Sequence, residues 1–247
     1  MKIRYLPLLM RYVYPAGDGL IGVCGDTLKD LATEMNIKPD IPLKVIPNPI
    51  DVKQIQQLAQ ESLDCPWFED NSPVILTVAR MAKQKQLDLL IRAVAKARET
   101  IPVKLIILGD GLLKDKLQAL CDELDIQEAV SMPGYVHNPY RYMKACDLFV
   151  LYSAWEGCPV ALEEALACGA AVIVNDAPGG SRDIVGDGKY GAVVPNNNPQ
   201  ALANTIVKIL NDPQLKKYYQ QQALLRCHDF QYQKISQQYL DFAIGCN

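Results

Sequence analysis

The sequence predicts an α/β protein whose parallel β-sheet is covered by helices on both faces. From Leu43 onward, short apolar runs rich in β-branched residues alternate with helix-length segments, and each run ends at a turn signal. The runs are apolar throughout, which is typical of strands buried on both faces of a parallel sheet. A chain of 247 residues with 49% hydrophobic and 21% charged residues can also form a substantial core.

Seven runs are candidate strands, at 43–47, 73–79, 103–109, 129–134, 147–153, 170–176 and 190–195. Apolar residues recur at helical spacing in three segments between them, at 87–100, 112–124 and 199–212. A short helix is expected from Pro159 to Cys168, because proline suits the first turn of a helix and Gly169 the position after its end. Segment 227–247 is predicted as a final amphipathic helix.

Composition excludes several classes of function. A formal net charge of −3 argues against a nucleic-acid-binding surface, which normally shows a basic face. The eight cysteines are scattered without a C-x-x-C pair and only two histidines accompany them, so a structural zinc site is not expected. We therefore expect buried, reduced cysteines in a cytoplasmic protein rather than a framework of disulfide bonds.

The first residues, MKIRYLPLLMRYV, are too short an apolar run for a signal peptide or a spanning helix, because Arg11 interrupts it. A basic, aromatic start of this kind could contact a membrane surface or form a structural helix that packs against the protein. The structural helix is the commoner of the two. The expected location is therefore the cytoplasm, with peripheral contact at the inner face of the membrane as the open alternative.

The carboxyl ends of parallel strands are where such sheets bind ligands, so the loops after the strands are the candidate site. These loops cover 80–85, 109–111, 134–138, 152–159 and 176–183. Three carboxylates, Glu156, Glu163 and Glu164, lie in or beside the apolar helix that follows one of them. A buried carboxylate needs a partner, so the residues alone leave two interpretations open: ligand-binding groups or ion-paired supports.

Several motifs, in this order, resemble the retaining glycosyltransferases of the two-lobed GT-B fold, and specifically glycosyltransferase family 4. VIPNPID (45–51) is similar to the crossover between the lobes, and VARMAKQKQLDLLIRA (78–93) to the segment whose Arg and Lys hold the donor diphosphate. ILGDGLLKDKL (107–117) resembles the G-D-G loop of that family. Residues 134–195 resemble its nucleotide-sugar half, including an E-x7-E motif with Glu156 first and Glu164 second.

The resemblance implies a Rossmann-like donor lobe and only a remnant of the other lobe. The expected domains are 1–50, the last βαβ of the N-terminal acceptor lobe; 51–226, the donor-binding lobe; and 227–247, a helix that returns toward the N-terminal lobe. A truncated reading frame, an expressed fragment and one half of a split enzyme all stay open as explanations. Apolar residues that would face the missing lobe are expected to meet water or each other and to favour self-association or binding of a separate N-terminal lobe (Leu6, Leu8, Leu9, Ile235, Tyr239 and Phe242).

The resemblance also implies roles for individual residues. Glu164 would bind the ribose hydroxyls of the donor and Glu156 would face the transferred sugar, whereas Glu163 would point to solvent or to a neighbouring cation. Arg80 and Lys85 would neutralise the diphosphate, and with Glu156 they form the expected catalytic set. Further donor contacts are expected at Gly109, Gly111, Val136, Gly157, Cys158, Pro159 and Val160. One departure from the family pattern is Gln86, where a Gly normally follows the donor Lys, and we expect a stiffer or more crowded loop there.

The function that these residues imply is transfer of a hexose or N-acetylhexosamine, with retention, from a nucleotide sugar to a glycan or lipid-linked acceptor. A UDP-sugar is preferred to GDP-mannose as donor, and no metal or other cofactor is expected because no D-x-D motif is present. The alternatives are a non-catalytic sugar-nucleotide-binding subunit of a split transferase and a GT-B epimerase. Without an acceptor lobe, the chain alone is expected to transfer sugar poorly.

Overall fold

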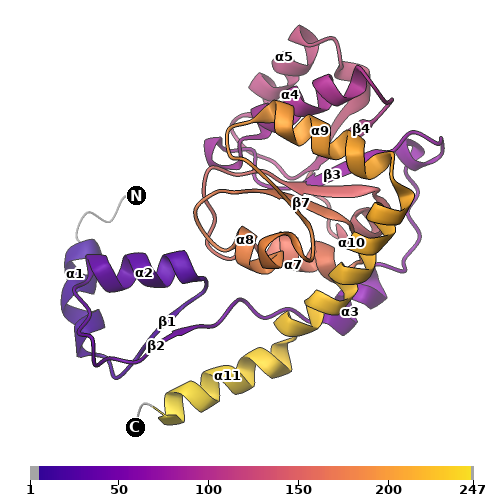
Figure 1. The fold of residues 1–247 in the computed structure, drawn as a ribbon. Helices are drawn as coiled ribbons and strands as arrows, with labels where there is room; N and C mark the ends of the chain where they lie inside the picture. Colours follow the sequence, from indigo (N-terminus) through magenta and orange to yellow (C-terminus); the bar gives the residue numbers. More distant parts are fainter. Residues whose placement is uncertain (1–5, 246–247) are drawn as a thin grey trace.

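The computed structural model describes residues 6–245, with side chains from Leu8 onward, as a large unit and a small unit joined by an extended linker (Figure 1). The large unit is built on a six-stranded sheet of order β5-β4-β3-β6-β7-β8, in which every pair of neighbours is parallel. Its strands are β3 (Val74–Val78), β4 (Lys104–Leu108), β5 (Val130–Gly134), β6 (Leu148–Leu151), β7 (Val172–Asn175) and β8 (Ala192–Val194).

Helices cover both faces of this sheet. One face packs against α4 (Leu87–Arg98), α5 (Lys114–Glu123) and α9 (Pro199–Leu210). The other packs against α3 (Val52–Leu58), α6 (Tyr140–Ala145), α7 (Val160–Ala167), α8 (Ser181–Ile184) and α10 (Pro213–Arg226). Single-turn 3₁₀ helices lie at Pro66–Phe68, Lys83–Lys85, Gln127–Ala129, Gly186–Gly188 and Cys227–Phe230.

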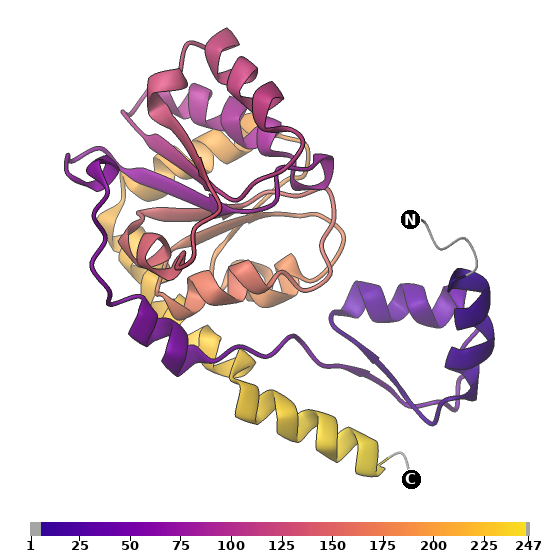
Figure 2. The same ribbon diagram turned by 180° about the vertical axis from the view of Figure 1, so that it is seen from behind.

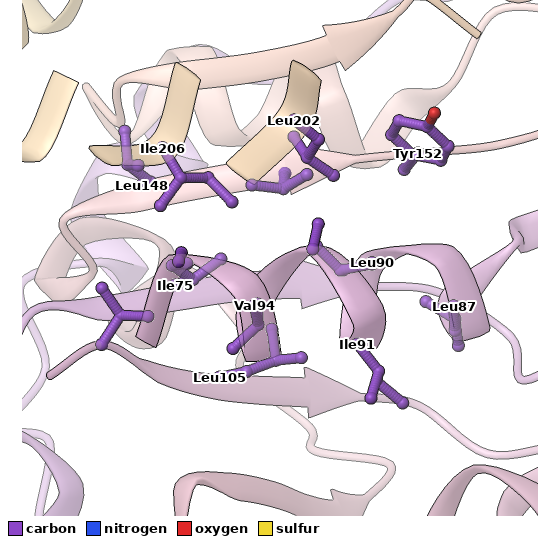
Figure 3. Close-up of a cluster of buried hydrophobic side chains, with 14 of the residues drawn as sticks. Ile75, Leu87, Leu90, Ile91, Val94, Leu105, Leu148, Tyr152, Leu202 and Ile206 are labelled. Carbon is purple, nitrogen blue, oxygen red and sulfur yellow. The ribbon is translucent and has the colours of Figure 1, made fainter. Parts of the chain in front are cut away.

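Successive residues of each strand face opposite layers, so the sheet has a core on each side. Ile75, Leu105 and Leu148 pack with Leu90 of α4 and Ile206 of α9, as Figure 3 shows. Leu76, Ile106 and Phe149, each one residue further along its strand, belong to the core on the other face. The fully apolar runs of the sequence are thus explained by burial on both sides.

The sequence-based fold is confirmed. All seven predicted strands form, with ends that differ by a few residues, and the helices expected at 87–100, 112–124 and 199–212 are α4, α5 and α9. The helix expected from Pro159 to Cys168 is α7, in which Pro159 and Cys168 are the capping residues. Gly169 follows with a left-handed φ of 76°. The seven cysteines of the described part of the chain are free, and five of them are buried; Cys246 lies outside it.

The small unit contains the βαβ expected within residues 1–50. Strands β1 (Leu20–Gly22) and β2 (Leu43–Val45) are parallel neighbours connected by α2 (Gly25–Glu34). They are preceded by α1 (Leu6–Val13) and a 3₁₀ turn at Tyr14–Ala16. Among the helices of residues 6–245, none has the length and apolar character needed to cross a bilayer.

The last helix, α11 (Tyr232–Gly245), runs back along the linker toward the small unit (Figure 2). Its start is fixed by a parallel bridge between Ile50 and Gln231. Near its end, the Phe242 ring lies 5.9 Å from Lys44 Nζ of β2.

The expected exposure of the apolar seam is confirmed only in part. Leu8, Leu9 and Tyr239 are exposed, at 56%, 59% and 39%. For Ile235 the expectation is wrong: it is 1% exposed, because the first turn of α11 is still held against the large unit near Ile50. The side chain of Leu6 lies outside the described residues, and self-association stays a prediction.

Candidate functional site

The loops at the carboxyl edge of the sheet bring Lys85 and Glu156 together. Lys85 Nζ donates to Glu156 Oε1 at 2.5 Å, and the two side chains are 18% and 7% exposed. Ser153 Oγ donates to the same oxygen at 2.6 Å. Both hydrogen bonds therefore use Oε1, and Oε2 of Glu156 is the oxygen left for another partner.

A buried amide fixes the loop that carries Glu156. Asn175, the last residue of β7, accepts from the Ser153 amide at 2.9 Å and donates to the Ser153 carbonyl at 2.7 Å. It also donates to Asn196 Oδ1, at 2.8 Å, in the loop after β8. Asn175 is 2% exposed, so these hydrogen bonds satisfy its buried side chain and position Ser153 beneath Glu156.

Glu164 lies in α7 and accepts a hydrogen bond from the Tyr140 hydroxyl at 2.9 Å. Burial raises the pKa of Glu164, while the tyrosine hydroxyl lowers it. The pKa of Tyr140 is raised, first by burial and then by the Glu164 charge. The hydroxyl is thus a persistent donor and the carboxylate an acceptor.

Glu163 does not point to solvent or to a cation, and that expectation is wrong. Its side chain is fully buried, because α7 packs against helices on several sides, and Oε1 accepts from Cys158 Sγ at 3.0 Å. Its second oxygen has no hydrogen-bond partner among the described residues. Burial, with a smaller contribution from the charge of Glu164, raises the pKa of Glu163 to about 8, so the carboxyl is mainly neutral at pH 7.

Arg80, two residues after the end of β3, is exposed, and its side chain forms no hydrogen bond or ion pair with any described residue. With Gly111 and the fully exposed Leu112 it lines a hollow of about 410 Å³. Gly109 has a φ of 126°, and a Cβ there would meet the Ala79 carbonyl oxygen at 2.2 Å. The glycines of the G-D-G loop thus let it lie directly against the segment that carries Arg80.

The start of α7 faces the same edge. Pro159 is its capping residue, Val160 and Gly157 are exposed, and Cys158 is buried with its carbonyl accepting from Asn48 of the linker at 2.9 Å. The amides of Val160 and Ala161, in the first helical turn, have no acceptor among the described residues. Such a helix start favours an anion.

The small unit contacts these loops through the start of α2. Asp26 Oδ2 accepts from the amide of Gly179 at 2.8 Å, and the amide of Gly25 lies 3.4 Å from Asp183 Oδ2. Gly179 has a φ of 117° and lies so close to the Glu156 loop that a Cβ would be 1.7 Å from the Glu156 carbonyl oxygen. The loop after β7 therefore joins the small unit to the loop of Glu156.

The loop after Lys85, where the sequence led us to expect a stiffer or more crowded backbone, has an unusual conformation at Gln86. Gln86 has a left-handed backbone with φ 39° and ψ 38°, a conformation that favours glycine. Its side chain donates to Asn197 Oδ1, at 2.8 Å, in the loop after β8. Val136, the remaining expected donor contact, is partly buried in the loop after β5.

Three residues that the sequence analysis missed support the carboxylates: Ser153, Asn175 and Tyr140. A signal existed for Asn175, the first polar residue at the end of an apolar run, and for Ser153, three residues before Glu156. Neither residue type implies a carboxylate partner by itself. Among residues 6–245, no group of three or more His, Cys, Asp or Glu side chains could hold a metal ion.

This parallel sheet, flanked by helices and followed by a helix that returns to a small βαβ unit, is the architecture of GT-B glycosyltransferases. A glycosyltransferase from Rickettsia africae aligns with 98% of this chain and 67% of its own, with a TM-score of 0.81 and 19% identity. The Anabaena protein HepE in complex with UDP aligns with 93% of this chain and 64% of its own, with a TM-score of 0.80 and 23% identity.

The chain belongs to the family of glycosyl transferases group 1, whose model matches residues 66–226. Over 237 residues it is 35% identical to a Campylobacter jejuni protein, N-acetylgalactosamine-N,N'-diacetylbacillosaminyl-diphospho-undecaprenol 4-alpha-N-acetylgalactosaminyltransferase. That alignment covers 96% of this chain and 63% of the relative. A Methanocaldococcus jannaschii protein described as an uncharacterized glycosyltransferase is 34% identical over 78% of this chain and 55% of its own.

Proposed function

We propose that this chain provides the donor site of a retaining glycosyltransferase of family 4, which transfers an N-acetylhexosamine or hexose from a UDP-sugar. The observation that carries the proposal is the convergence of Lys85, Glu156, Glu164 and the start of α7 at one edge of the sheet. A basic side chain, two carboxylates and unpaired amides at the carboxyl ends of parallel strands suit an anionic, hydroxyl-rich ligand.

In this proposal the diphosphate is bound by cations and amides of the protein. The side chain of Arg80 is exposed and unpaired within the described part of the chain, Lys85 follows in the same loop, and the amides of Val160 and Ala161 lie at the start of α7. Charge that develops on the leaving diphosphate is where such groups act most strongly. We propose that no metal ion is required, so a chelator should leave UDP affinity unchanged.

The two carboxylates are proposed to bind opposite ends of the donor. Glu164 would accept from the ribose hydroxyls, and the free oxygen of Glu156 would accept from a hydroxyl of the transferred sugar. The base would lie along the loop of Val136, where backbone groups are available. Both carboxylates would bind the donor as acceptors, and they accept most strongly in the ionised form.

The names of the relatives support the choice of substrates. The Campylobacter relative is a 4-alpha-N-acetylgalactosaminyltransferase acting on a diphospho-undecaprenol-linked sugar, and a Staphylococcus aureus relative is a poly(ribitol-phosphate) alpha-N-acetylglucosaminyltransferase. We therefore place N-acetylhexosamine first among donor sugars, and a glycan or lipid-linked glycan as acceptor. The proposed place of action is the cytoplasm, at the inner membrane face when the acceptor is lipid-linked.

Calorimetric titration with UDP and GDP tests the donor site. Glu164→Gln and Arg80→Ala should each weaken UDP binding by about 1–3 kcal/mol, the range for losing a hydrogen bond to a charged group. Arg92→Ala is the matched control, because Arg92 is an exposed arginine of α4 with only a 3.9 Å ion pair to Glu123. Unchanged UDP affinity in both site variants would refute the assignment.

Radiolabelled transfer from UDP-N-acetylhexosamine distinguishes an enzyme from a donor-binding subunit. Transfer by this chain, alone or with a supplied acceptor lobe, that is lost in Glu156→Ala supports catalysis here. Donor binding with transfer that survives Glu156→Ala would assign the chemistry to another chain.

A further inference from the structure

We propose that Tyr140 is a positioning residue of the donor site: its hydroxyl holds one oxygen of Glu164 so that the other oxygen is presented to the ribose. The inference rests on the proposed function, because it gives Glu164 the ribose as partner. It adds a residue from a different helix, α6, 24 positions earlier in the chain.

The geometry of Glu164 carries the argument. The Tyr140 hydroxyl donates to Glu164 Oε1 at 2.9 Å, and this is the one side-chain hydrogen bond that Glu164 makes with the described residues. A carboxylate held at a single oxygen keeps Oε2 free, and that oxygen can accept hydrogen bonds from vicinal hydroxyls. Without the hydroxyl, Glu164 would have no side-chain hydrogen bond among the described residues to fix its rotamer.

Tyr140 is itself held in place, which a positioning residue requires. Asn138, 7% exposed, accepts from the Tyr140 amide at 3.1 Å through Oδ1. Its Nδ2 donates to the Leu58 carbonyl at 3.0 Å and to Glu61 Oε2 at 2.9 Å. A line of hydrogen bonds thus leads from the end of α3, through the first residue of α6, to the carboxylate on α7.

The same hydroxyl affects the charge of Glu164. Burial raises the pKa of the carboxyl and the Tyr140 hydroxyl lowers it. The ionised form of Glu164 is the stronger acceptor for the ribose hydroxyls, so its contribution to binding weakens as the pH falls through this pKa. Removing the hydroxyl raises the pKa, and the loss should then begin at a higher pH.

The test compares UDP with 2′,3′-dideoxy-UDP, which has the same base and diphosphate but lacks both ribose hydroxyls. The ratio of the two affinities measures recognition of the ribose, and it cancels titration of the diphosphate itself. The variants are Tyr140→Phe, Glu164→Gln and the double variant. Tyr142→Phe is the matched control: Tyr142 lies on the same helix, packs edge-on against Phe68 at 6.2 Å and forms no side-chain hydrogen bond with the described residues.

We expect Tyr140→Phe to weaken UDP by about tenfold and to leave dideoxy-UDP unchanged, since about 1.4 kcal/mol corresponds to a factor of ten. The pH at which the preference for UDP halves should move upward in this variant and stay unchanged in Tyr142→Phe. The double variant should be no weaker than Glu164→Gln alone, because both changes remove the same contact.

The outcomes distinguish the ribose-binding role of Glu164 from the positioning role of Tyr140. If wild-type protein does not prefer UDP to dideoxy-UDP, or Glu164→Gln keeps that preference, the ribose role of Glu164 fails and the inference fails with it. If Glu164→Gln loses the preference while Tyr140→Phe keeps it with an unshifted pH profile, the donor site stands and the role of Tyr140 is refuted. Equal loss of UDP and dideoxy-UDP affinity in Tyr140→Phe would show a merely structural role and also refute it.

Discussion

Replacing Glu156 by Gln should strengthen the binding of free UDP. In the structure, Lys85 is already occupied by Glu156, whereas the proposed function gives Lys85 to the donor diphosphate. The donor must therefore draw the lysine away from a carboxylate that it contacts at 2.5 Å. If Glu156 only contacted the transferred sugar, as the sequence suggests, its replacement would hardly change the affinity for UDP. The ion pair with Lys85 instead predicts that UDP binds more tightly once Glu156 is neutralised.

The size of the effect follows from the burial of the pair. The side chains are 18% and 7% exposed, so water screens the pair weakly. Neutralising Glu156 leaves a largely buried lysine without its counter-charge, and a diphosphate can supply the missing partner. A hydrogen bond to a charged group contributes about 1.5–3 kcal/mol, which predicts UDP affinity roughly 10- to 100-fold higher in Glu156→Gln.

Isothermal titration of UDP and UDP-N-acetylhexosamine against the wild-type protein and the variant provides the assay. The gain should be smaller for the nucleotide sugar, because the variant also loses the contact of Glu156 with the sugar. Lys85→Met should weaken the binding of both ligands, and adding Glu156→Gln to this variant should restore little of the lost affinity. Unchanged or weaker UDP binding in Glu156→Gln would refute the idea that the donor competes with Glu156 for Lys85.

Three further predictions concern stability and the loops. Because burial raises the pKa of Glu163 to about 8, its contribution to stability is present below the unfolded pKa and is lost as pH rises through 8. Between pH 5 and 9, Glu163→Gln should therefore lose less stability than the wild-type protein, by about 2–4 kcal/mol in urea unfolding. A pH profile identical to that of wild type would contradict this. Gln86→Ala should be about 1 kcal/mol less stable than Gln86→Gly, because alanine pays the left-handed backbone cost at φ 39°, and equal melting curves would argue against strain. Gly179→Ala should destabilise the protein by about 2–4 kcal/mol and weaken UDP-sugar binding, since its Cβ would be 1.7 Å from the Glu156 carbonyl oxygen. Gly188→Ala, at φ 100° with open space around it, is the control and should show backbone strain alone. An equal loss of stability in the two variants would count against the close contact.

The fold could be predicted because its signals are local. The central strands β3, β4, β6 and β7 are mainly apolar runs buried on both faces, and α4 and α9 show their buried residues at helical spacing. The carboxyl edge of the sheet then follows from the strands, so the loops of the site were placed without any contact being known. The sequence also marked the loop after Lys85 as unusual, since Gln86 stands where the family pattern has a glycine, and Gln86 has a left-handed backbone there.

The partners of the site residues could not be predicted in the same way. Lys85 and Glu156 are 71 positions apart, and only the adjacency of β3 and β6 in the sheet brings their loops together. The family resemblance assigns a part of the donor to Lys85 and another to Glu156. It does not indicate that the two side chains contact each other when no donor is bound. The supporting Asn175 is likewise visible only once β7 lies beside β6.

Glu163 shows most clearly where sequence periodicity stops being informative. A helix with one apolar face reveals which residues point outward, but α7 is apolar on nearly all sides because it is packed on several of them, so no face marks the exit to solvent. Two successive glutamates then point about 100° apart around the helix, one toward Tyr140 and the other toward Cys158. Two adjacent charges would repel in so dry a place, and the raised pKa of Glu163 relieves this by keeping its carboxyl neutral. With a neutral neighbour, Glu164 has no like charge beside it, and this favours the ionised form that accepts most strongly from the ribose hydroxyls.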